Sequence, residues 1–397
     1  MRVLLINKFL RPVGGTETVF FDQWRWLEAA GHHVIPFGLQ HPDNQPHPYQ
    51  AYELPAPDYN RYSLKQAIDL IWSRSAARRL NQLIRATQPD VAHLHNIYHQ
   101  LSPSILATLE QHAIPAIMTV HDYKLICPNY RLYTQNEICQ RCLHGSPWSA
   151  WRHRCLKDSQ VASALVALET TLHRLGRVYH TIKQFITPSH FLRQKLISGG
   201  YPTDQIITIP HAIPSPPPPQ PPPITTPYIF FAGRLEPEKG IALILRLATQ
   251  LPQLQFILAG TGQLQAHIHA QNLPNIRLLG HLPPHQLAAW RQHARLVLVP
   301  SHWYETFGLT ALEAMADARP VLASNHGALP ELINHQETGF LLPPTNIDPW
   351  QQTIQQLWHN PSLTTKIGQQ AREWVNCHFT PAQHQQAIWT QLTAVLS

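Results

Sequence analysis

Short apolar runs alternate with segments of helical periodicity along both halves of the sequence. Such runs predict the buried strands of parallel sheets, and the amphipathic segments between them predict covering helices. In the first half the predicted strands are residues 3–7, 33–37, 91–95, 116–121 and 184–188. In the second half they are residues 228–232, 255–259, 296–300 and 320–323. The pattern predicts an α/β protein with two doubly wound, Rossmann-like domains.

A proline-rich segment separates the two halves. Residues 214–223 consist of Pro, Ser and Gln alone, a composition that enforces an extended polyproline conformation. Such segments also bind aromatic grooves of partner domains, but a position between two α/β units favours a stiff spacer. We expect a first domain at 1–213, a linker at 214–226 and a second domain at 227–380. A length of 397 residues suits two domains that face a cleft.

The charge balance leaves the type of partner open. The sequence has 30 Lys and Arg residues against 23 Asp and Glu, a formal net charge of +7 that suits phosphate or anionic surfaces and equally suits simple solubility. The opening run at 1–6 is not followed by the apolar core and cleavage site of a signal peptide, so we interpret it as a buried strand. No window approaches the ~18 apolar residues of a membrane span. We therefore expect a cytoplasmic protein.

One basic amphipathic stretch bears on membrane contact. Its cations are Arg61, Lys65, Arg74, Arg78, Arg79 and Arg85. Because apolar residues are interleaved with them, the stretch suits peripheral contact with anionic lipid at the inner face of a membrane. An ordinary half-buried helix is the alternative interpretation.

A double glycine follows the first predicted strand. Gly14 and Gly15 precede a helical segment at 18–29, so their backbone N–H groups would lie at a helix N-terminus, where phosphates bind. An ordinary tight turn requires the same residues, and both interpretations stay open.

Two cations follow the first strand of the second half. Gly233 and Arg234 open this loop and Lys239 comes five residues after the arginine, an arrangement that suits a diphosphate leaving group or a pair of solvated surface charges. Gly260 and Gly262 follow the next strand, where a glycine turn lets the backbone approach a nucleotide. The placement of the cations between a strand and a helix favours phosphate binding.

Two glutamates follow the third strand of the second half. Glu305 and Glu313 are eight residues apart, so on one helix they would point ~80° apart and lie ~12 Å apart along its axis. This spacing excludes a close acid/base pair and favours two separate contacts along an extended ligand. A helix-opening acid and a surface acid are the alternative. Backbone N–H groups between the glutamates are expected to face a phosphate, at Gly308, Leu309 and Thr310.

Four motifs, taken in order, resemble those of glycosyltransferase family four. They are Gly-Gly-Thr-Glu near the start, Gly-Arg-Leu-Glu-Pro-Glu-Lys-Gly, Gly-Thr-Gly and the Glu-x7-Glu segment, and together they cover nearly the whole chain. The resemblance implies the two-Rossmann GT-B fold, a retaining mechanism and a nucleotide-diphosphate sugar bound mainly by the second domain. It also implies a last helix at 381–396 that returns to the first domain.

The resemblance implies roles for individual residues as well. By the resemblance, Arg234 and Lys239 would bind the diphosphate. Glu305 would bind the hydroxyls of the donor sugar and Glu313 the ribose, and Gly15 would close over the phosphates. His121, at the end of the strand 116–121, matches the family's position beside the sugar. A histidine there hydrogen-bonds a sugar hydroxyl or supports charge in the transition state, whereas a satisfied structural histidine is the alternative.

The chain departs from the family at two loops. It reads Ile-Pro-His-Ala-Ile at 209–213 where an Asn-Gly pair is common, and Gly-Ala-Leu-Pro-Glu at 327–331 where a second glycine is common. Acceptor shape and domain closure are the features that these departures affect. No Asp-x-Asp motif follows a strand, and the family's leaving diphosphate is thought to help deprotonate the acceptor, so we expect neither a catalytic metal nor a dedicated nucleophile.

Four of the five cysteines cluster in an insertion at 127–155. Cys127, Cys139, Cys142 and Cys155 have the spacing C-x11-C-x2-C-x12-C, which can close one tetrahedral thiolate site. Without a signal sequence, a structural zinc is favoured over disulfides. Unligated thiols and an iron–sulfur cluster stay open, because only one Cys-x2-Cys knuckle is present. The segment follows His121, so we expect it on the acceptor side of the first domain.

These features together predict a retaining transferase. It would move a sugar from a nucleotide-diphosphate donor to a glycan, lipid-linked or small-molecule acceptor, in polysaccharide or cell-envelope glycoconjugate synthesis. A non-catalytic nucleotide-sugar binding or regulatory subunit is the alternative, although Glu305, Arg234 and Lys239 are all retained. A zinc-dependent nucleic-acid binder would leave those residues unexplained and lacks a basic-aromatic stacking platform, so we expect no nucleic-acid partner.

Overall fold

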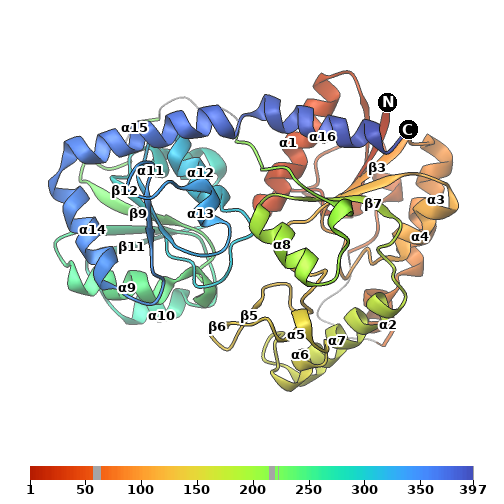
Figure 1. Ribbon diagram of the computed structural model, residues 1–397, viewed down its shortest axis with the longest axis horizontal. Helices are drawn as coiled ribbons and strands as arrows, with labels where there is room; N and C mark the ends of the chain where they lie inside the picture. The colour runs from red at the N-terminus through yellow and green to blue at the C-terminus, as the bar shows by residue number, and fades with distance from the viewer. Residues whose placement is uncertain (57–63, 214–219, 222, 397) are drawn as a thin grey trace. The chain divides into compact units, whose positions relative to one another are not determined.

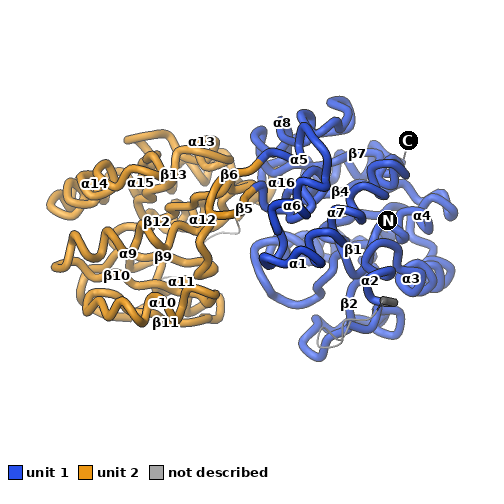
Figure 2. Tube along the Cα trace, turned by 90° about the horizontal axis from the view of Figure 1, so that it is seen from below, with its two compact units in different colours: residues 1–132, 140–210, 384–397 blue, residues 133–139, 211–383 orange. Residues whose placement is uncertain are grey.

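The computed structural model describes residues 1–56, 64–213, 220–221 and 223–396. The chain forms two compact units, which Figure 2 distinguishes by colour. Unit 1 comprises residues 1–132, 140–210 and 384–397, and unit 2 comprises residues 133–139 and 211–383. Much of the predicted linker, residues 214–219 and 222, lies outside the described residues, as does Arg61.

A six-stranded parallel sheet forms the centre of unit 1 (Figure 1). Across the sheet the strands are β2 (His33–Leu39), β1 (Arg2–Phe9), β3 (Val91–Leu94), β4 (Ala116–Thr119), β7 (Ile182–Thr187) and β8 (Ile206–Thr208). In register, Val3 pairs with Val34 on one side and Val91 on the other. The chain order of the strands therefore reverses between β1 and β3.

The helices of unit 1 connect these strands. They are α1 (Gly15–Ala29), α2 (Leu64–Ile71), α3 (Arg74–Thr87), α4 (Ser104–Gln111), α5 (Arg141–His144), α6 (Ser149–Arg152), α7 (Gln160–Leu175), α8 (His190–Ser198) and α16 (Pro381–Ala394), with 3-10 turns η1 (Gln50–Tyr52) and η2 (Thr203–Gln205). Serines cap three of them, because the hydroxyls of Ser73, Ser159 and Ser189 each accept a backbone N–H of the first turn.

A second six-stranded parallel sheet forms the centre of unit 2. Its order is β11 (Ile276–Gly280), β10 (Gln255–Ala259), β9 (Tyr228–Ala232), β12 (Leu296–Val299), β13 (Val321–Ser324) and β14 (Phe340–Leu342). The connecting elements are η3 (Pro237–Lys239), α9 (Ile241–Gln250), α10 (Gln265–Ala270), α11 (Pro284–Gln292), α12 (Leu309–Ala316), α13 (Leu329–Leu332), α14 (Asp348–His359) and α15 (Pro361–His378). Chain order reverses between β9 and β12. The predicted fold class, two doubly wound α/β domains, is confirmed.

Both faces of the unit 2 sheet are buried. Alternate residues of a strand point to opposite faces. Ile229 and Phe231 of β9 accordingly pack in a core with α9 and α14, and Tyr228 and Phe230 pack in another with α11 and α12. Burial on both faces explains why these strands read as continuous apolar runs.

Helix α16 belongs to the core of unit 1. Ile388 and Leu392 are buried against residues of β1 and α1, among them Val3 and Phe20. The imidazole of His384 lies 2.8 Å from the carbonyl oxygen of Pro210. Unit 1 is thus completed by residues that follow the whole of unit 2 in the sequence.

The cysteine-bearing segment forms small local elements. A two-stranded antiparallel hairpin of β5 (Tyr133–Thr134) and β6 (Glu137–Ile138) precedes α5 and α6. The hairpin groups with unit 2, and the rest of the segment groups with unit 1. The insertion at 127–155 in the first domain stays a prediction.

The predicted basic stretch forms α2 and α3. On α3 the apolar face is buried at Leu80 and Leu83, while Arg74 and Arg78 are exposed. Along the described part of the chain, no helix is both long and apolar enough to cross a membrane.

Candidate functional site

The reversal of strand order marks the expected ligand position in each sheet. In open α/β sheets, ligands bind beyond the carboxyl ends of the strands on either side of such a reversal. In unit 2 these strands are β9 and β12, and the loops that follow them carry Arg234, Lys239 and Glu305. In unit 1 they are β1 and β3.

Lys239 and Glu305 form an ion pair at the reversal in unit 2. The Lys239 Nζ atom lies 2.7 Å from Glu305 Oε1, and the two side chains are 20% and 11% exposed. The ammonium group also lies 4.8 Å from the centre of the Trp303 ring. The structure therefore brings together two of the predicted site residues, from loops 66 residues apart in the sequence.

The environment of Glu305 keeps its carboxylate ionised. Burial by itself raises the pKa of this carboxyl, but the Lys239 charge and the hydrogen bonds from Lys239 and Ser301 outweigh burial and hold the pKa below its usual value. The Ser301 hydroxyl donates to Glu305 Oε1 at 2.5 Å. The backbone of Glu305 is held too, since its carbonyl accepts the N–H of Ala328 at 3.0 Å.

Arg234 lies in the same loop and has a different partner. Its guanidinium donates to Glu238 Oε1 at 3.1 Å, and the arginine side chain is 53% exposed while that of Glu238 is 2% exposed. The loop therefore presents one exposed cation and one cation in a largely buried pair.

Glycines pack the backbone of these loops closely together. A Cβ atom on Gly260 would lie 1.9 Å from the carbonyl oxygen of Gly233, and Gly260 has a φ of +133°. A Cβ on Gly262 would lie 2.5 Å from the carbonyl oxygen of Leu235. Only glycine fits at these two positions, because the loop after β10 packs directly on the loop after β9.

Helix α12 begins later than the Glu-x7-Glu segment suggests. Gly308 has a φ of +111° and caps the helix, which starts at Leu309. Glu305 therefore lies in the preceding loop, and the prediction that Glu305 and Glu313 share one helix is wrong. The N–H groups of Leu309 and Thr310 lie in the first turn, where backbone donors have no acceptor within the helix.

Glu313 lies within helix α12 and pairs with an arginine that the motifs did not indicate. Arg291 Nη1 donates to Glu313 Oε2 at 2.8 Å, and Arg291 Nε donates to Asp317 Oδ2 at 2.6 Å. Glu313 is 31% exposed and Asp317 is 1% exposed. The two glutamates thus have separate partners, and the ribose-binding role of Glu313 stays a prediction.

At the reversal in unit 1, two asparagines from the two strand ends contact each other. Asn7 at the end of β1 accepts the N–H of Asn96 at 3.1 Å and donates to Glu17 Oε1 at 3.2 Å. Gly14 precedes α1 and Gly15 is its first residue. A Cβ on Gly14 would meet no atom closer than 3.8 Å, so sterics alone do not require this glycine.

His121 follows β4 and contacts a second histidine. Its Nε2 atom lies 2.8 Å from His95 Nδ1, and the two rings stack with centroids 5.1 Å apart. Burial and the neighbouring His95 and His384 hold the pKa of His121 well below its usual value, so its ring is neutral near pH 7.

Four further polar residues of unit 1, Lys8, Asp122, Lys124 and Glu169, were not indicated by the sequence motifs. Burial lowers the pKa of Lys8 and raises that of Asp122 to about 6, while each group opposes the shift of the other. Lys124 is buried and pairs with Glu169 at 2.6 Å. Lys8 lies near the end of β1 and Asp122 just after β4, so the rule that sites lie at strand ends was the available signal.

Cys127 and Cys142, two of the four cysteines of the predicted zinc site, form hydrogen bonds within their own turns. The described ranges contain no group of three or more His, Cys, Asp or Glu side chains that could hold a metal ion. The Cys127 thiol donates to Asn129 Oδ1 at 2.9 Å and the Cys142 thiol to the Pro147 carbonyl at 3.8 Å, each within its own turn. The four-thiolate zinc site stays a prediction for elemental analysis.

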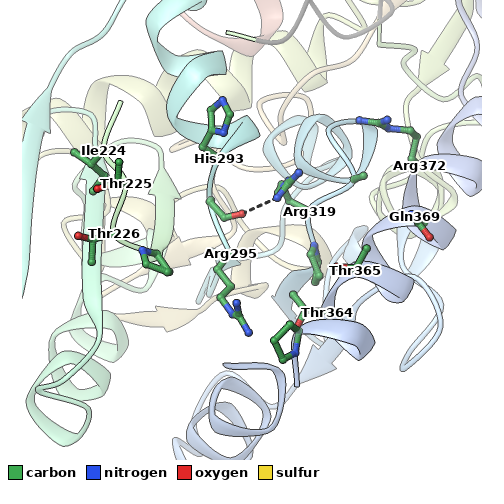
Figure 3. Close-up of a pocket in the computed structure, with 15 residues that line it drawn as sticks. Ile224, Thr225, Thr226, His293, Arg295, Arg319, Thr364, Thr365, Gln369 and Arg372 are labelled. Atoms are coloured by element: carbon green, nitrogen blue, oxygen red, sulfur yellow. Dashed lines mark hydrogen bonds between the residues drawn. The ribbon is translucent and has the colours of Figure 1, made fainter. Parts of the chain in front are cut away.

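A polar pocket of about 670 Å³ opens at the other end of the unit 2 sheet (Figure 3). Its lining includes residues that directly precede β9, β12 and β13, among them Arg295 and Arg319. Arg319 donates to the Ala294 carbonyl at 3.3 Å. Because the pocket lies at the amino ends of the strands, it is separate from the Lys239–Glu305 site.

Two family models match consecutive parts of the chain. The model described as Glycosyltransferase Family 4 matches residues 13–215, about half of the chain, and the model described as Glycosyl transferases group 1 matches residues 217–374. The boundary between the two matches falls in the proline-rich segment.

Curated relatives match over shorter stretches. The D-rhamnosyltransferase WbpZ of Pseudomonas aeruginosa is 27% identical over 216 residues, which are 50% of this chain and 54% of that protein. The D-inositol 3-phosphate glycosyltransferase of Mycobacterium leprae is 36% identical over 154 residues, which are 36% of this chain and 35% of that protein. The chain thus spans about half, or less, of the length of these relatives.

Solved structures match over the full length. A sucrose-phosphate synthase from Thermosynechococcus elongatus has a TM-score of 0.73 at 20% identity, covering 99% of both chains. Anabaena HepE in complex with UDP and glucose has a TM-score of 0.69 at 18% identity, covering 99% of this chain and 100% of that one. At these identities the likeness establishes the fold.

Proposed function

The chain belongs to glycosyltransferase family 4, and on that premise we propose that it is a retaining transferase that uses a nucleotide-diphosphate sugar. The observation that carries the proposal is the Lys239–Glu305 ion pair at the strand reversal of unit 2. Unit 2 would bind the donor, and unit 1 would present the acceptor side of the reaction.

The charges of unit 2 suit a diphosphate. An ammonium has three N–H donors, and Lys239 gives one of them to Glu305, so further donors remain for phosphate oxygens. Arg234 adds an exposed guanidinium, which binds phosphate in a bidentate manner. Two cations at this position would stabilise the charge that develops on the leaving diphosphate.

Glu305 would contact the donor sugar. Its carboxylate is ionised and accepts hydrogen bonds from Lys239 and Ser301, and its pairing with Lys239 would place the sugar next to the diphosphate. A carboxylate accepts from several donors at once, so sugar hydroxyls would add to the existing contacts. The first turn of α12 would supply the N–H groups of Leu309 and Thr310 to a phosphate.

The acceptor class rests on the relatives. WbpZ is a rhamnosyltransferase, and one structural neighbour is a lipopolysaccharide outer core galactosyltransferase. These names support a glycan or lipid-linked acceptor, or a small molecule, in polysaccharide or cell-envelope glycoconjugate synthesis. Because solved neighbours were crystallised with UDP and UDP-glucose, UDP-sugars are the first donors to test.

The test is a thermal-shift panel of UDP-, GDP- and ADP-sugars, followed by a transfer assay. A ligand that binds only the native state raises its melting temperature. We expect one nucleotide class to stabilise the wild type and the Lys366→Met control, whose lysine is exposed on α15, but not Lys239→Met. Stabilisation that survives Lys239→Met would reject the donor site, and donor binding without transfer to any acceptor would favour a non-catalytic binder.

Retention has its own readout. NMR of the product from an α-linked donor should show an α-glycosidic bond in the first turnover. A β-linked product would reject the retaining mechanism without affecting the donor assignment.

A further inference from the structure

A chain of hydrogen bonds runs behind His121 in unit 1. His95, directly after β3, bonds to His121 at one ring nitrogen, and its Nε2 atom lies 2.8 Å from Gln23 Oε1 on α1. The other end of the Gln23 amide, Nε2, contacts His93 Nδ1, and His93 Nε2 lies 2.8 Å from the Thr119 hydroxyl. Five side chains from α1, β3, β4 and the segments that follow these two strands therefore form one continuous series.

The series is buried and its rings are packed in a stack. Gln23, His93, His95 and Thr119 are each at most 3% exposed. The His93 and His95 rings stack with centroids 4.7 Å apart, and Phe20 packs edge-on against His95 at 5.4 Å. This packing leaves the rings little freedom to turn, so each nitrogen keeps its own partner.

Two histidines of this series, His93 and His121, are neutral, and the complete burial of His95 likewise disfavours its charged form. Burial lowers the pKa of His93 to about 3, and it lowers that of His121 well below 6.5. A neutral imidazole has one nitrogen that donates and one that accepts. The direction of every hydrogen bond in the series is therefore set as soon as one of them is known.

The Gln23 amide sets this direction, because its oxygen can only accept and its nitrogen can only donate. His95 Nε2 faces the amide oxygen and must donate, so His95 Nδ1 accepts. His121 Nε2 must then donate to His95 Nδ1, which leaves the lone pair of His121 on Nδ1. At the other end, His93 Nδ1 accepts from the amide nitrogen and His93 Nε2 donates to Thr119.

We propose that Gln23 and His95 are positioning residues that hold His121 as the neutral Nε2–H tautomer, so that its Nδ1 atom accepts a hydrogen bond from a substrate hydroxyl. The proposal rests on the proposed function for the identity of that hydroxyl, a sugar hydroxyl of the donor or the acceptor. We call the hold of Gln23 and His95 on the His121 ring the clamp. The clamp itself rests only on the contacts within unit 1.

A fixed tautomer has a chemical consequence at the site. A histidine that presents Nδ1–H would donate to the substrate oxygen, whereas the Nε2–H form accepts from the hydroxyl and increases the electron density on its oxygen. The two forms interact with a reacting hydroxyl in opposite senses. A mixture of tautomers would leave a fraction of the enzyme in the wrong form.

Nitrogen NMR of the purified protein tests the clamp directly. With ¹⁵N-histidine labelling at pH 7.5, two-bond and three-bond couplings distinguish Nδ1–H from Nε2–H rings. The His121 signals are assigned by their loss in His121→Asn. We expect the pure Nε2–H pattern in the wild type. An Nδ1–H pattern, a mixture or an imidazolium at His121 would overturn the proposal, whether or not the protein transfers sugar.

Two variants separate the clamp from simple packing. Gln23→Met keeps the side-chain length but removes both amide atoms, and we expect the His121 pattern to become mixed and kcat to fall about tenfold, with KM for the donor changed less than about twofold. Thr119→Val breaks the far end of the same buried series, and we expect the His121 pattern to stay as in the wild type.

The outcomes separate this proposal from the proposed function. A wild-type His121 pattern in Gln23→Met, or an unchanged kcat in spite of a mixed pattern, would reject the positioning role. A pure Nε2–H pattern in a protein that binds no nucleotide sugar would leave the clamp in place and reject the transferase.

Discussion

The two units use the same kind of sheet and place different chemistry at the point where strand order reverses. In unit 2 the reversal carries a lysine and a glutamate that form an ion pair, with an exposed arginine in the same loop. In unit 1 the reversal carries two asparagines, and His121 nearby is kept neutral by burial and by His95. One end-of-strand site therefore carries a cation paired with a carboxylate, and the other carries two asparagines and a neutral histidine.

Under the proposed function, this difference would let one backbone plan serve two tasks. A diphosphate needs fixed cations, and a cation in a largely buried position is tolerated when a carboxylate pairs with it. A group that contacts a neutral sugar hydroxyl needs a defined hydrogen-bond direction rather than charge. The strand ends supply both, because the fold only sets where side chains emerge.

The largest effect is expected from a variant that breaks the Lys239–Glu305 ion pair. Lys239→Met should lower kcat/KM by about 1,000-fold, because it removes a cation from the leaving diphosphate. It should also destabilise unit 2 by about 2 kcal/mol, because Glu305 would stay buried without its partner. Steady-state kinetics and urea unfolding measure the two effects.

The double variant sharpens this result. Lys239→Met with Glu305→Gln should recover most of the lost stability but none of the activity.

His121→Ala should lower kcat by about 10- to 100-fold, since it removes a hydrogen bond rather than a charge. A larger loss for His121→Ala than for Lys239→Met would reverse the comparison.

The glycine loops give the next largest difference. Gly260→Ala should destabilise the protein by about 3 kcal/mol, because its Cβ would overlap the Gly233 carbonyl at a φ that L-residues rarely adopt. Gly14→Ala should change the free energy of unfolding by less than about 0.5 kcal/mol, because space is available. Equal losses in urea unfolding would remove the distinction between a packed loop in unit 2 and an open one in unit 1.

Acidification should affect the two sites in different pH windows. The pKa of His93 is lowered from 6.5 to about 3, so the unfolded state binds more protons between these values. The stability that His93 contributes is therefore lost as the pH falls below about 6.5, at about 1.4 kcal/mol per pH unit. The pKa of Glu305 is lowered from 4.5, so its contribution persists above that value and is lost only at lower pH.

Variants isolate these two windows. The free energy of unfolding of His93→Gln should depend less steeply on pH than that of the wild type between pH 6.5 and 5. Glu305→Gln should differ in slope from the wild type only below pH 4.5. Parallel wild-type and His93→Gln curves would mean that His93 is charged in the folded state.

The smallest effect concerns Arg234. Because its side chain is 53% exposed, Arg234→Gln should change the free energy of unfolding by less than about 0.5 kcal/mol. It should raise KM for the donor about tenfold, since a phosphate contact is lost. An unchanged KM would leave Lys239 as the cation that binds the diphosphate.

The strands were predictable to the extent that they are buried. The sequence predicted β1, β2, β3, β4, β7, β9, β10, β12 and β13, and it missed the edge strands β8, β11 and β14 as well as the small hairpin. A central strand is covered on both faces and reads as an apolar run. An edge strand such as β11 is only partly buried, so its sequence resembles that of a loop.

The site was predictable in its parts and less so in its pairings. Motifs indicated Lys239 and Glu305 separately, but nothing in the sequence showed that they contact each other. Gln23 and His95 were missed because an apolar helix and a strand hide single polar residues, whose role depends on neighbours far along the chain. The predicted angle and distance between Glu305 and Glu313 assumed one helix, but α12 begins only at Leu309, after its cap Gly308.

The position of α16 bears on the order in which the protein is made. Ile388 and Leu392 belong to the core of unit 1, so residues 1–210 leave the ribosome long before that core can close. Unit 2 is complete in sequence at residue 383 and is free to fold first. Domains generally fold in the order of their synthesis. Here the unit that starts the chain finishes last, and until then the apolar residues that α16 covers stay exposed.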